Sequence, residues 1–292
     1  MKLRAYAKVN LGLDVLRRRE DGYHDVRMIM QTIQMYDLLE IEKSETPGIH
    51  LSTNLNYIPV NENNLVYKAA KLLMNQYGIR EGVTVKLNKF IPVAAGMAGG
   101  SSDAAATLVG INRLFQLGLS RQQLMEFGVK IGADVPYCVM RGTALAEGIG
   151  EKLTALPPMP QCYILIGKPG ISVSTKYVYT HLNVGSETHH PDIDGMIRAL
   201  QDGNLYGITD RMENVLESVT IPAYPVIETI KDHMKAHGAV NAMMSGSGPT
   251  VFGVFDDKEK AEYACRELKE SMLTKQTFLT TVFNNGGTPD DK

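Results

Sequence analysis

The chain has 292 residues, of which 44% are hydrophobic, and its 30 basic and 32 acidic side chains leave a formal net charge of −2. This length allows a substantial core and two domains, whereas the balanced charge argues against a nucleic-acid-binding surface. Cys138, Cys162 and Cys265 lie far apart, so we expect three buried thiols in a reducing compartment and no zinc site. The beginning of the sequence lacks the apolar core of a signal peptide, which predicts a cytoplasmic location.

The first predicted element is the clearest strand in the sequence. Alternate residues from Leu3 to Val15 are apolar, which predicts one buried face and places Lys8 and Asn10 on the opposite face. After a turn at residues 18–22, further strands are predicted near residues 23–35 and over residues 37–42.

Helices follow these strands. The pattern predicts a helix over residues 64–78 with a glycine stop, then a strand over residues 83–89. A small-residue stretch supplies the start of the next helix, and Ser120 with Gln123 forms a capping box for another helix.

Three prolines within residues 156–161 interrupt any regular element and predict a domain boundary. We therefore expect domains at residues 1–156 and 161–284, followed by a loose tail at residues 285–292. The second half is predicted to contain a strand, several helices, two strands, a helix and a final strand. This order approximates the β-α-β-β-α-β unit of a ferredoxin-like fold.

The stretch PVAAGMAGGSSDAAATL, residues 92–108, places a flexible loop directly before a helix. It contains neither the GxxxxGK[ST] pattern nor GxGxxG, but it has the physical features by which those motifs bind phosphate. Glycines 96, 99 and 100 allow a phosphate chain to approach the backbone, and the helix dipole and the hydroxyls of Ser101 and Ser102 favour an anion. On composition alone, a serine-capped turn explains the stretch equally well.

Other candidate residues have ordinary structural explanations at this stage. The stretch at residues 243–255 is typical of a hairpin with a Gly-Pro turn. Lys8 and Asn10 fit a solvated strand face, and Asp134 fits a helix cap or turn. Tyr23 and His24 fit residues beside a turn.

Three segments in order, AYAKVNLGL, PVAAGMAGGSSDAAA and MSGSGPTVF, resemble the GHMP kinase superfamily. The resemblance extends over residues 2–284. It implies an α+β, two-domain GHMP kinase fold, with an N-terminal domain like ribosomal protein S5 domain 2 and a ferredoxin-like C-terminal domain.

The resemblance implies transfer of the γ-phosphoryl group of ATP, with Mg²⁺, to an alcohol. The narrower segments DGYHDV, IGADVPYC and RMENVLE imply that the acceptor is the C2 hydroxyl of cytidine diphosphate methylerythritol, in non-mevalonate isoprenoid precursor synthesis. The family match makes Asp134 the general base and Lys8 the cation that stabilises its charge and the developing alkoxide. It names no protein ligand for the metal.

The same resemblance implies two binding regions. The residues implied for ATP are Pro92, Val93, Ala94, Ala95, Gly96, Met97, Ala98, Gly99, Gly100, Ser101, Ser102, Asn64 and Lys89. The residues implied for the acceptor are Asn10, Tyr23, His24, Thr175 and Tyr179, with Tyr23 and Tyr179 stacking on cytosine and His24 reading its edge. Three alanines, Ala94, Ala95 and Ala98, replace glycines that are common in the family's loop. The loop at residues 245–250 is expected to close over the site.

Three other functions are weaker hypotheses. A kinase for another small alcohol, such as homoserine or a mevalonate-type acid, has no need of the Tyr23–His24 segment. A non-catalytic binding protein would not need Lys8 and Asp134 together with the intact loop. RNA binding is disfavoured by the charge balance. We expect no nucleic-acid or membrane partner, and a monomer or weak homodimer.

Overall fold

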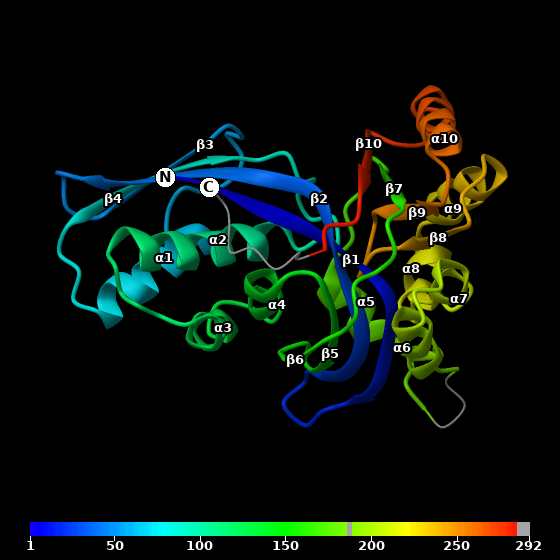
Figure 1. Cartoon of the computed structure of the whole chain (residues 1–292), viewed down its shortest axis with the longest axis horizontal. Coiled ribbons are helices and arrows are strands. Elements are labelled where there is room, and N and C mark those ends of the chain that lie inside the picture. The colour runs from blue at the N-terminus through cyan, green and yellow to red at the C-terminus, as the bar shows by residue number, and fades with distance from the viewer. Residues whose placement is uncertain (186–188, 285–292) are drawn as a thin grey trace.

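The computed structural model describes residues 1–185 and 189–284, and the predicted tail at 285–292 lies outside these residues. The chain forms two β-sheets with helices packed on each, which is the α+β class expected from the sequence (Figure 1). Residues 156–161 form no helix or strand and connect the last strand of the first sheet to the first strand of the second. None of the helices in the described part is long and apolar enough to cross a membrane.

The first sheet has six strands in the order β3-β4-β2-β5-β6, with β1 also paired to β2. The strands are β1 (Lys2–Arg18), β2 (His24–Ser44), β3 (Ile49–Thr53), β4 (Gly82–Asn88), β5 (Thr143–Gly148) and β6 (Lys152–Ala155). The sequence analysis did not predict β3, β5 and β6. It also divided β2 into two strands, which is wrong. Strand β2 continues unbroken because β1 pairs with it along its length and because no proline or glycine interrupts residues 24–44.

Strand β1 is confirmed, but the prediction that its apolar residues share one face is wrong. Irregularities in the pairing with β2 occur between Tyr6 and Lys8 and again between Asn10 and Gly12. Each one turns the following side chains to the other side of the sheet. As a result, the segment between them packs in a different hydrophobic cluster from the two ends of the strand. Both faces of β1 are buried from residue 5 to residue 15.

Four helices lie together against one face of the first sheet: α1 (Leu65–Gln76), α2 (Gly99–Leu114), α3 (Arg121–Val129) and α4 (Val135–Met140) (Figure 1). The Asn64 side chain caps α1 by accepting a bond from Val66 N. The predicted capping box at α3 is confirmed, since Ser120 and Gln123 each bond the other's backbone N–H.

The second sheet is antiparallel, in the order β10-β7-β9-β8. Its strands are β7 (Tyr163–Lys168), β8 (Asn241–Met244), β9 (Val251–Phe255) and β10 (Gln276–Thr281). The first crossover contains α5 (Thr175–His181), α6 (Ile193–Gln201), α7 (Leu205–Thr209), α8 (Glu217–Ala223) and α9 (Val226–Ala236), and the second contains α10 (Lys258–Glu270). This arrangement confirms the predicted ferredoxin-like unit.

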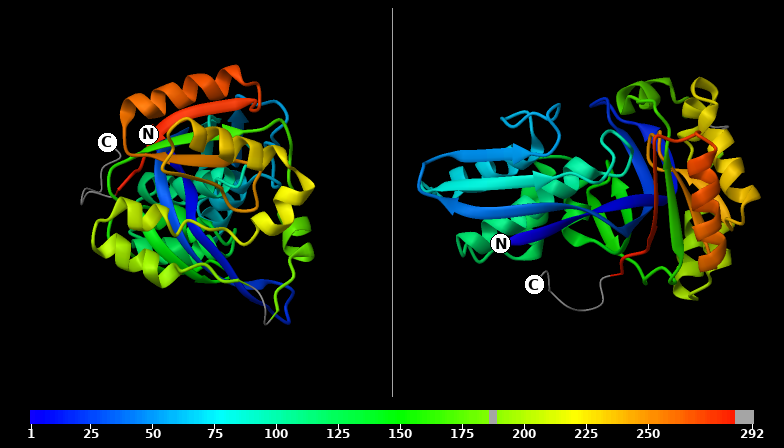
Figure 2. Two further views of the ribbon diagram at one scale, coloured as in Figure 1. Left: turned by 90° about the vertical axis from the view of Figure 1, so that its right-hand side faces the viewer. Right: turned by 90° about the horizontal axis from the view of Figure 1, so that it is seen from above.

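The two sheets share a hydrophobic core. The middle of β1, including Val9 and Leu11, packs in the same cluster as Ile164 of β7 and Phe252 of β9. After β10 the chain turns back toward the first sheet (Figure 2). There the Phe283 ring stacks on Tyr6, with ring centroids 4.3 Å apart, and Phe283 N donates to Thr32 O at 2.8 Å. The three cysteines are buried and free, as expected.

Candidate active site

A cleft of about 1150 Å³ lies between the two halves of the chain. Its wall includes the middle of β1, the loop before α2, the start of α4, the start of α5 and residues 246–247. Strand β1 reaches the cleft because two of its pairing irregularities flank Lys8 and Asn10. The sequence pattern alone placed these side chains on a solvated face, but Lys8 is 5% exposed and Asn10 is fully buried.

Lys8 and Asp134, the predicted catalytic residues, face each other in this cleft. The Lys8 ammonium lies 3.9 Å from Asp134 Oδ2 and donates to Asn10 Oδ1 at 2.7 Å. Asp134 occupies the N-cap position of α4, but its side chain makes no capping bond and is about a third exposed (32%). Its carboxylate is therefore not held by the helix and is accessible to a proton donor in the cleft.

The glycine-rich loop lines another part of the cleft. Gly96 has φ of 73°, and a Cβ there would lie 2.1 Å from Ser245 O, so only glycine fits. The Ser245 hydroxyl donates to Gly96 O at 2.9 Å, and Lys8 N donates to Met97 O at 3.2 Å. These two carbonyl oxygens are thus occupied by protein donors instead of facing an anionic ligand.

The structure brings most of the residues predicted for ATP to the cleft. Those that line it are Pro92, Val93, Ala94, Ala95, Gly96, Ala98, Gly99, Gly100, Ser101, Asn64 and Lys89. Met97 and Ser102 do not line it, and both are buried. The Ser102 hydroxyl donates to Tyr6 O at 2.5 Å, so it ties α2 to β1. The Asn64 side chain bonds Val66 N and Pro59 O and shapes the backbone at the start of α1.

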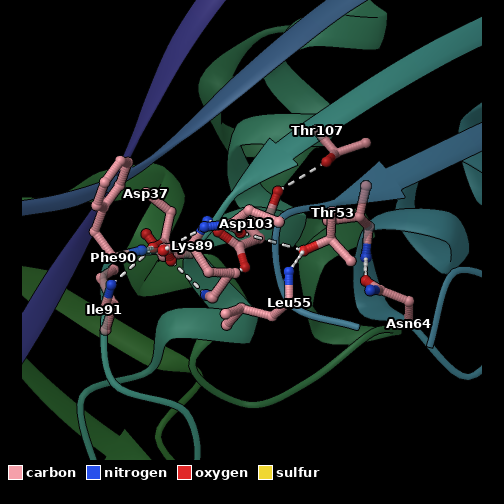
Figure 3. A network of polar contacts seen from close by, with 12 residues as sticks. Asp37, Thr53, Leu55, Asn64, Lys89, Phe90, Ile91, Asp103 and Thr107 are labelled. Atoms are coloured by element: carbon pink, nitrogen blue, oxygen red, sulfur yellow. Dashed lines mark hydrogen bonds and ion pairs between the residues drawn. The ribbon is translucent and has the colours of Figure 1, made fainter. Parts of the chain in front are cut away.

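Lys89 lies in a buried cluster with two aspartates that the sequence analysis missed (Figure 3). Its ammonium bonds Asp37 and also Asp103 Oδ2, the latter at 2.7 Å. Burial alone would lower the pKa of Lys89, but the charges of Asp103 and Asp37 outweigh this effect and the pKa is raised. Burial, assisted by the Asp37 charge, raises the pKa of Asp103 well above its ordinary value despite Lys89. The sequence does not single out Asp37, because Glu40 and Glu42 follow it in the same strand segment.

The residues predicted for the acceptor line the opposite part of the cleft. The rings of His24 and Tyr179 lie 5.2 Å apart at 43°, and Tyr23 is 60% exposed. Burial, followed by the Arg18 charge, lowers the pKa of His24, so its ring is neutral near pH 7. Thr175 and Ser247 hydroxyls bond each other at 2.8 Å and link α5 to the loop after β8.

Two cations in the cleft were not predicted, Arg18 and Lys176. Lys176 directly follows Thr175 in the sequence, whereas Arg18 is brought beside His24 by the pairing of β1 with β2, so only Lys176 had a local sequence signal. The loop after β8 is held by Asn214, whose amide donates to Met244 O at 2.9 Å and to Gly246 O at 2.8 Å. No group of three or more His, Cys, Asp or Glu side chains that could hold a metal occurs among residues 1–185 and 189–284.

Comparison with known proteins gives two family matches. The model described as "GHMP kinases N terminal domain" matches residues 64–142, and "GHMP kinases C terminal" matches residues 188–273. The first match contains the glycine-rich loop and Asp134, and the second contains Asn214 and the loop after β8.

Curated relatives match along nearly their whole length. A protein of Lachnospira eligens is 58% identical over 97% of this chain and 98% of its own length. One from Clostridium perfringens is 47% identical over 98% of this chain and 99% of its own length. Both are described as 4-diphosphocytidyl-2-C-methyl-D-erythritol kinase.

Solved structures agree with these matches. A crystal structure of 4-(cytidine 5'-diphospho)-2C-methyl-D-erythritol kinase has a TM-score of 0.83 at 31% identity and covers 97% of this chain and 99% of its own. A homoserine kinase from Cytophaga hutchinsonii has a TM-score of 0.78 at 20% identity, covers 97% of this chain and 94% of its own, and shares the fold.

Proposed function

This chain belongs to the GHMP kinases, and from that premise we propose that it transfers the γ-phosphoryl group of ATP to the C2 hydroxyl of 4-diphosphocytidyl-2-C-methyl-D-erythritol. Asp134 and Lys8 are the catalytic residues in this proposal. Phosphorylation of this alcohol in isoprenoid precursor synthesis is the activity of the relatives that the chain matches at 47–58% identity. The observation that carries the residue assignments is the partly exposed Asp134 carboxylate beside the buried Lys8 ammonium.

Asp134 takes the proton of the attacking hydroxyl in this proposal. Its side chain is free of the α4 cap and faces the cleft, as a general base requires. Lys8 holds a positive charge 3.9 Å from that carboxylate, and Asn10 fixes the ammonium from the other side. The ammonium favours the charge that develops on the acceptor oxygen as the proton leaves.

The loop before α2 holds the phosphates of MgATP, which enters as one substrate. Backbone N–H groups at the start of this 16-residue helix and the Ser101 hydroxyl supply the donors. The Mg²⁺ that accompanies the nucleotide would offset the negative charge of its phosphates. The cleft lining includes the Ser101 hydroxyl and the carboxylates of Asp21, Asp103 and Asp134, but among the described residues no acidic side chains gather into a group that could hold a metal. This donor set fits a metal held mainly by phosphate oxygens and water.

Recognition of the cytidine is assigned to Tyr23, His24 and Tyr179. Aromatic rings offer stacking surfaces for a base, and a neutral His24 presents one donor and one acceptor to its polar edge. Thr175 and Asn10 complete the acceptor side. We further propose division into domains at residues 1–156 and 161–284, and a cytoplasmic monomer or weak homodimer that acts on small molecules. The net charge of −2 supports the absence of a nucleic-acid partner.

The experiment is ADP release by the purified chain with ATP and Mg²⁺, comparing 4-diphosphocytidyl-2-C-methyl-D-erythritol with homoserine, mevalonate and no acceptor. Release that depends on the cytidyl substrate alone is expected. Release with homoserine or mevalonate instead would disprove the substrate assignment.

The catalytic roles are tested in the same assay. We expect Asp134→Asn to lower kcat by about 10² to 10⁴, the usual contribution of a positioned base. Asp256→Asn is the control, because Asp256 bonds Tyr206 and does not line the cleft. Turnover by Asp134→Asn within a few-fold of wild type would show that another group takes the proton.

A further inference from the structure

The phosphate loop has a conformation that its own residues do not favour. Ala94 has φ of 51° and Ala98 has φ of 55°, in the left-handed region. An L-residue other than glycine costs about 1–2 kcal/mol in this region. Such strain persists only where the surrounding structure determines the backbone. The structure must therefore contain contacts that hold this loop in place.

The buried cluster around Lys89 joins the segment before the loop to the helix after it (Figure 3). Lys89 follows β4 and comes directly before the loop, whereas Asp103 lies in α2 after it. Their ion pair joins positions 14 residues apart in sequence. The first turn of α2 also packs closely on the ammonium, because a Cβ on Gly99 would lie 3.2 Å from Lys89 Nζ.

Asp37 connects this closed loop to the central strand β2. Its Oδ1 accepts bonds from Phe90 N at 2.5 Å and Ile91 N at 2.8 Å, at the beginning of the loop. Its Oδ2 accepts a bond from the Lys89 ammonium. Asp37 is fully buried and does not line the cleft.

We propose that Asp37 is a positioning residue for nucleotide binding. Its carboxylate fixes the start of the phosphate loop and, through Lys89 and Asp103, the first turn of α2. It thereby holds the strained loop in the shape that binds phosphates. The proposal rests on the proposed function only in taking the loop's ligand to be a nucleotide.

The two aspartates have unequal roles in this arrangement. Asp37 receives three bonds, all from residues 89–91 at the beginning of the loop. Asp103 receives one from Lys89, and within the described residues its Oδ1 has no hydrogen-bond partner. An amide at position 103 keeps an oxygen for Lys89. An amide at position 37 can still accept from the loop but loses the charge that anchors the ammonium.

The experiment compares Asp37→Asn with Asp103→Asn in the full chain. We measure the Kd for ADP by calorimetry, and kcat and KM for MgATP and for the acceptor. Asp37→Asn is expected to raise the Kd for ADP and KM for MgATP about tenfold, the equivalent of one anchoring contact, while kcat at saturation changes less than about threefold. Asp103→Asn is expected to raise the Kd less than about threefold.

Glu217→Gln is the matched control. Glu217 is a half-buried carboxylate that also bonds a lysine, Lys231 at 2.7 Å, and a backbone N–H, Met244 N at 2.7 Å. The Glu217→Gln variant is expected to be less stable than wild type and to bind ADP with an unchanged Kd. A folded Asp37→Asn with Kd for ADP within about twofold of wild type would overturn the proposal, and so would a loss confined to kcat.

A measurement on the wild-type chain covers the case in which Asp37→Asn does not fold. The proposal requires that the backbone at the beginning of the loop is fixed before nucleotide binds. Hydrogen exchange at the Phe90 and Ile91 amides is therefore expected to be slow in the ligand-free chain and unchanged by ADP. Fast exchange that slows only with ADP would overturn the proposal.

The outcomes also separate this proposal from the proposed function. Normal ADP binding without turnover of the cytidyl substrate would contradict the proposed function alone. Failure of the wild-type chain to bind ADP would overturn both.

Discussion

Single buried acids determine much of the chemistry in this chain, and Asp103 shows how burial changes one of them. Its carboxyl group is almost fully buried, with Lys89 and Asp37 as its charged neighbours. Burial is the largest influence, and it raises the pKa of Asp103 well above the ordinary value. The folded state therefore binds this proton more tightly than the unfolded chain, whose aspartates release it near pH 4.

This shift predicts how stability changes with pH. Between the unfolded pKa and the higher folded pKa, the folded state binds more protons, so Asp103's contribution to stability falls as pH rises. Asp103→Asn removes this titration. We expect urea unfolding to show wild type losing stability relative to Asp103→Asn as pH rises above about 4, the ordinary pKa of an aspartate. A difference that is constant or grows in favour of wild type would contradict the raised pKa.

Residue identity alone did not reveal this cluster. Lys8 and Asp134 were predicted through the family resemblance, and the structure places them 3.9 Å apart. Asp37 and Asp103 lie 66 positions apart in the sequence and meet only because β2, β4 and α2 pack together. No local spacing connects such residues, so sequence patterns predict the contributing elements but not their meeting point.

At the scale of elements, the sequence was most informative where the determining interactions are local. The capping box of α3 was predicted because Ser120 and Gln123 are three residues apart and bond each other. The α1 glycine stop and the order of strands and helices along the second half of the chain followed from equally local signals. The buried faces of β1 were not predicted, because they depend on how β2 pairs with β1 at two irregular positions.

The α3 cap gives a prediction at this scale. Replacing Ser120 with alanine removes the hydroxyl that accepts the Gln123 N–H. We expect Ser120→Ala to lower the free energy of unfolding by about 1 kcal/mol. Gln122→Ala, an exposed change on the same helix, is the control and should change it by less than about 0.5 kcal/mol. Equal effects in urea unfolding would mean that the cap does not stabilise α3.

At the scale of the whole molecule, the two halves are joined through the cleft and around it. Ser245 of the second half bonds Gly96 of the glycine-rich loop, and Val215 N of the second half donates to Leu13 O of β1 at 3.0 Å. Neither contact was predicted, since each joins distant segments whose approach depends on the packing of both sheets. The division into two halves was predicted from the proline-rich segment, whereas the contact surface between the halves is known only from the structure.

The segment after β10 supports a stability prediction. Phe283 stacks on Tyr6 at 4.3 Å and 19°, and the half-buried ring covers part of the first sheet. Phe283→Ala is expected to lower the free energy of unfolding by about 2 kcal/mol, less than a fully buried phenylalanine would lose. Tyr263→Ala, which removes an exposed ring from α10, should lower it by less than about 1 kcal/mol. A Phe283 effect no larger than the Tyr263 effect would show that the stacking contributes little.

The return of the chain from β10 to the first sheet also imposes an order on biosynthesis. The strands β1–β6 leave the ribosome before residue 283 is made, yet the Tyr6 ring and the Thr32 carbonyl receive their partner only from that residue. The apolar middle of β1 likewise stays uncovered until β7 and β9 have been made and pack on it. A nascent chain thus carries a finished sheet with an open apolar surface, and this is the stage at which we expect chaperones to bind.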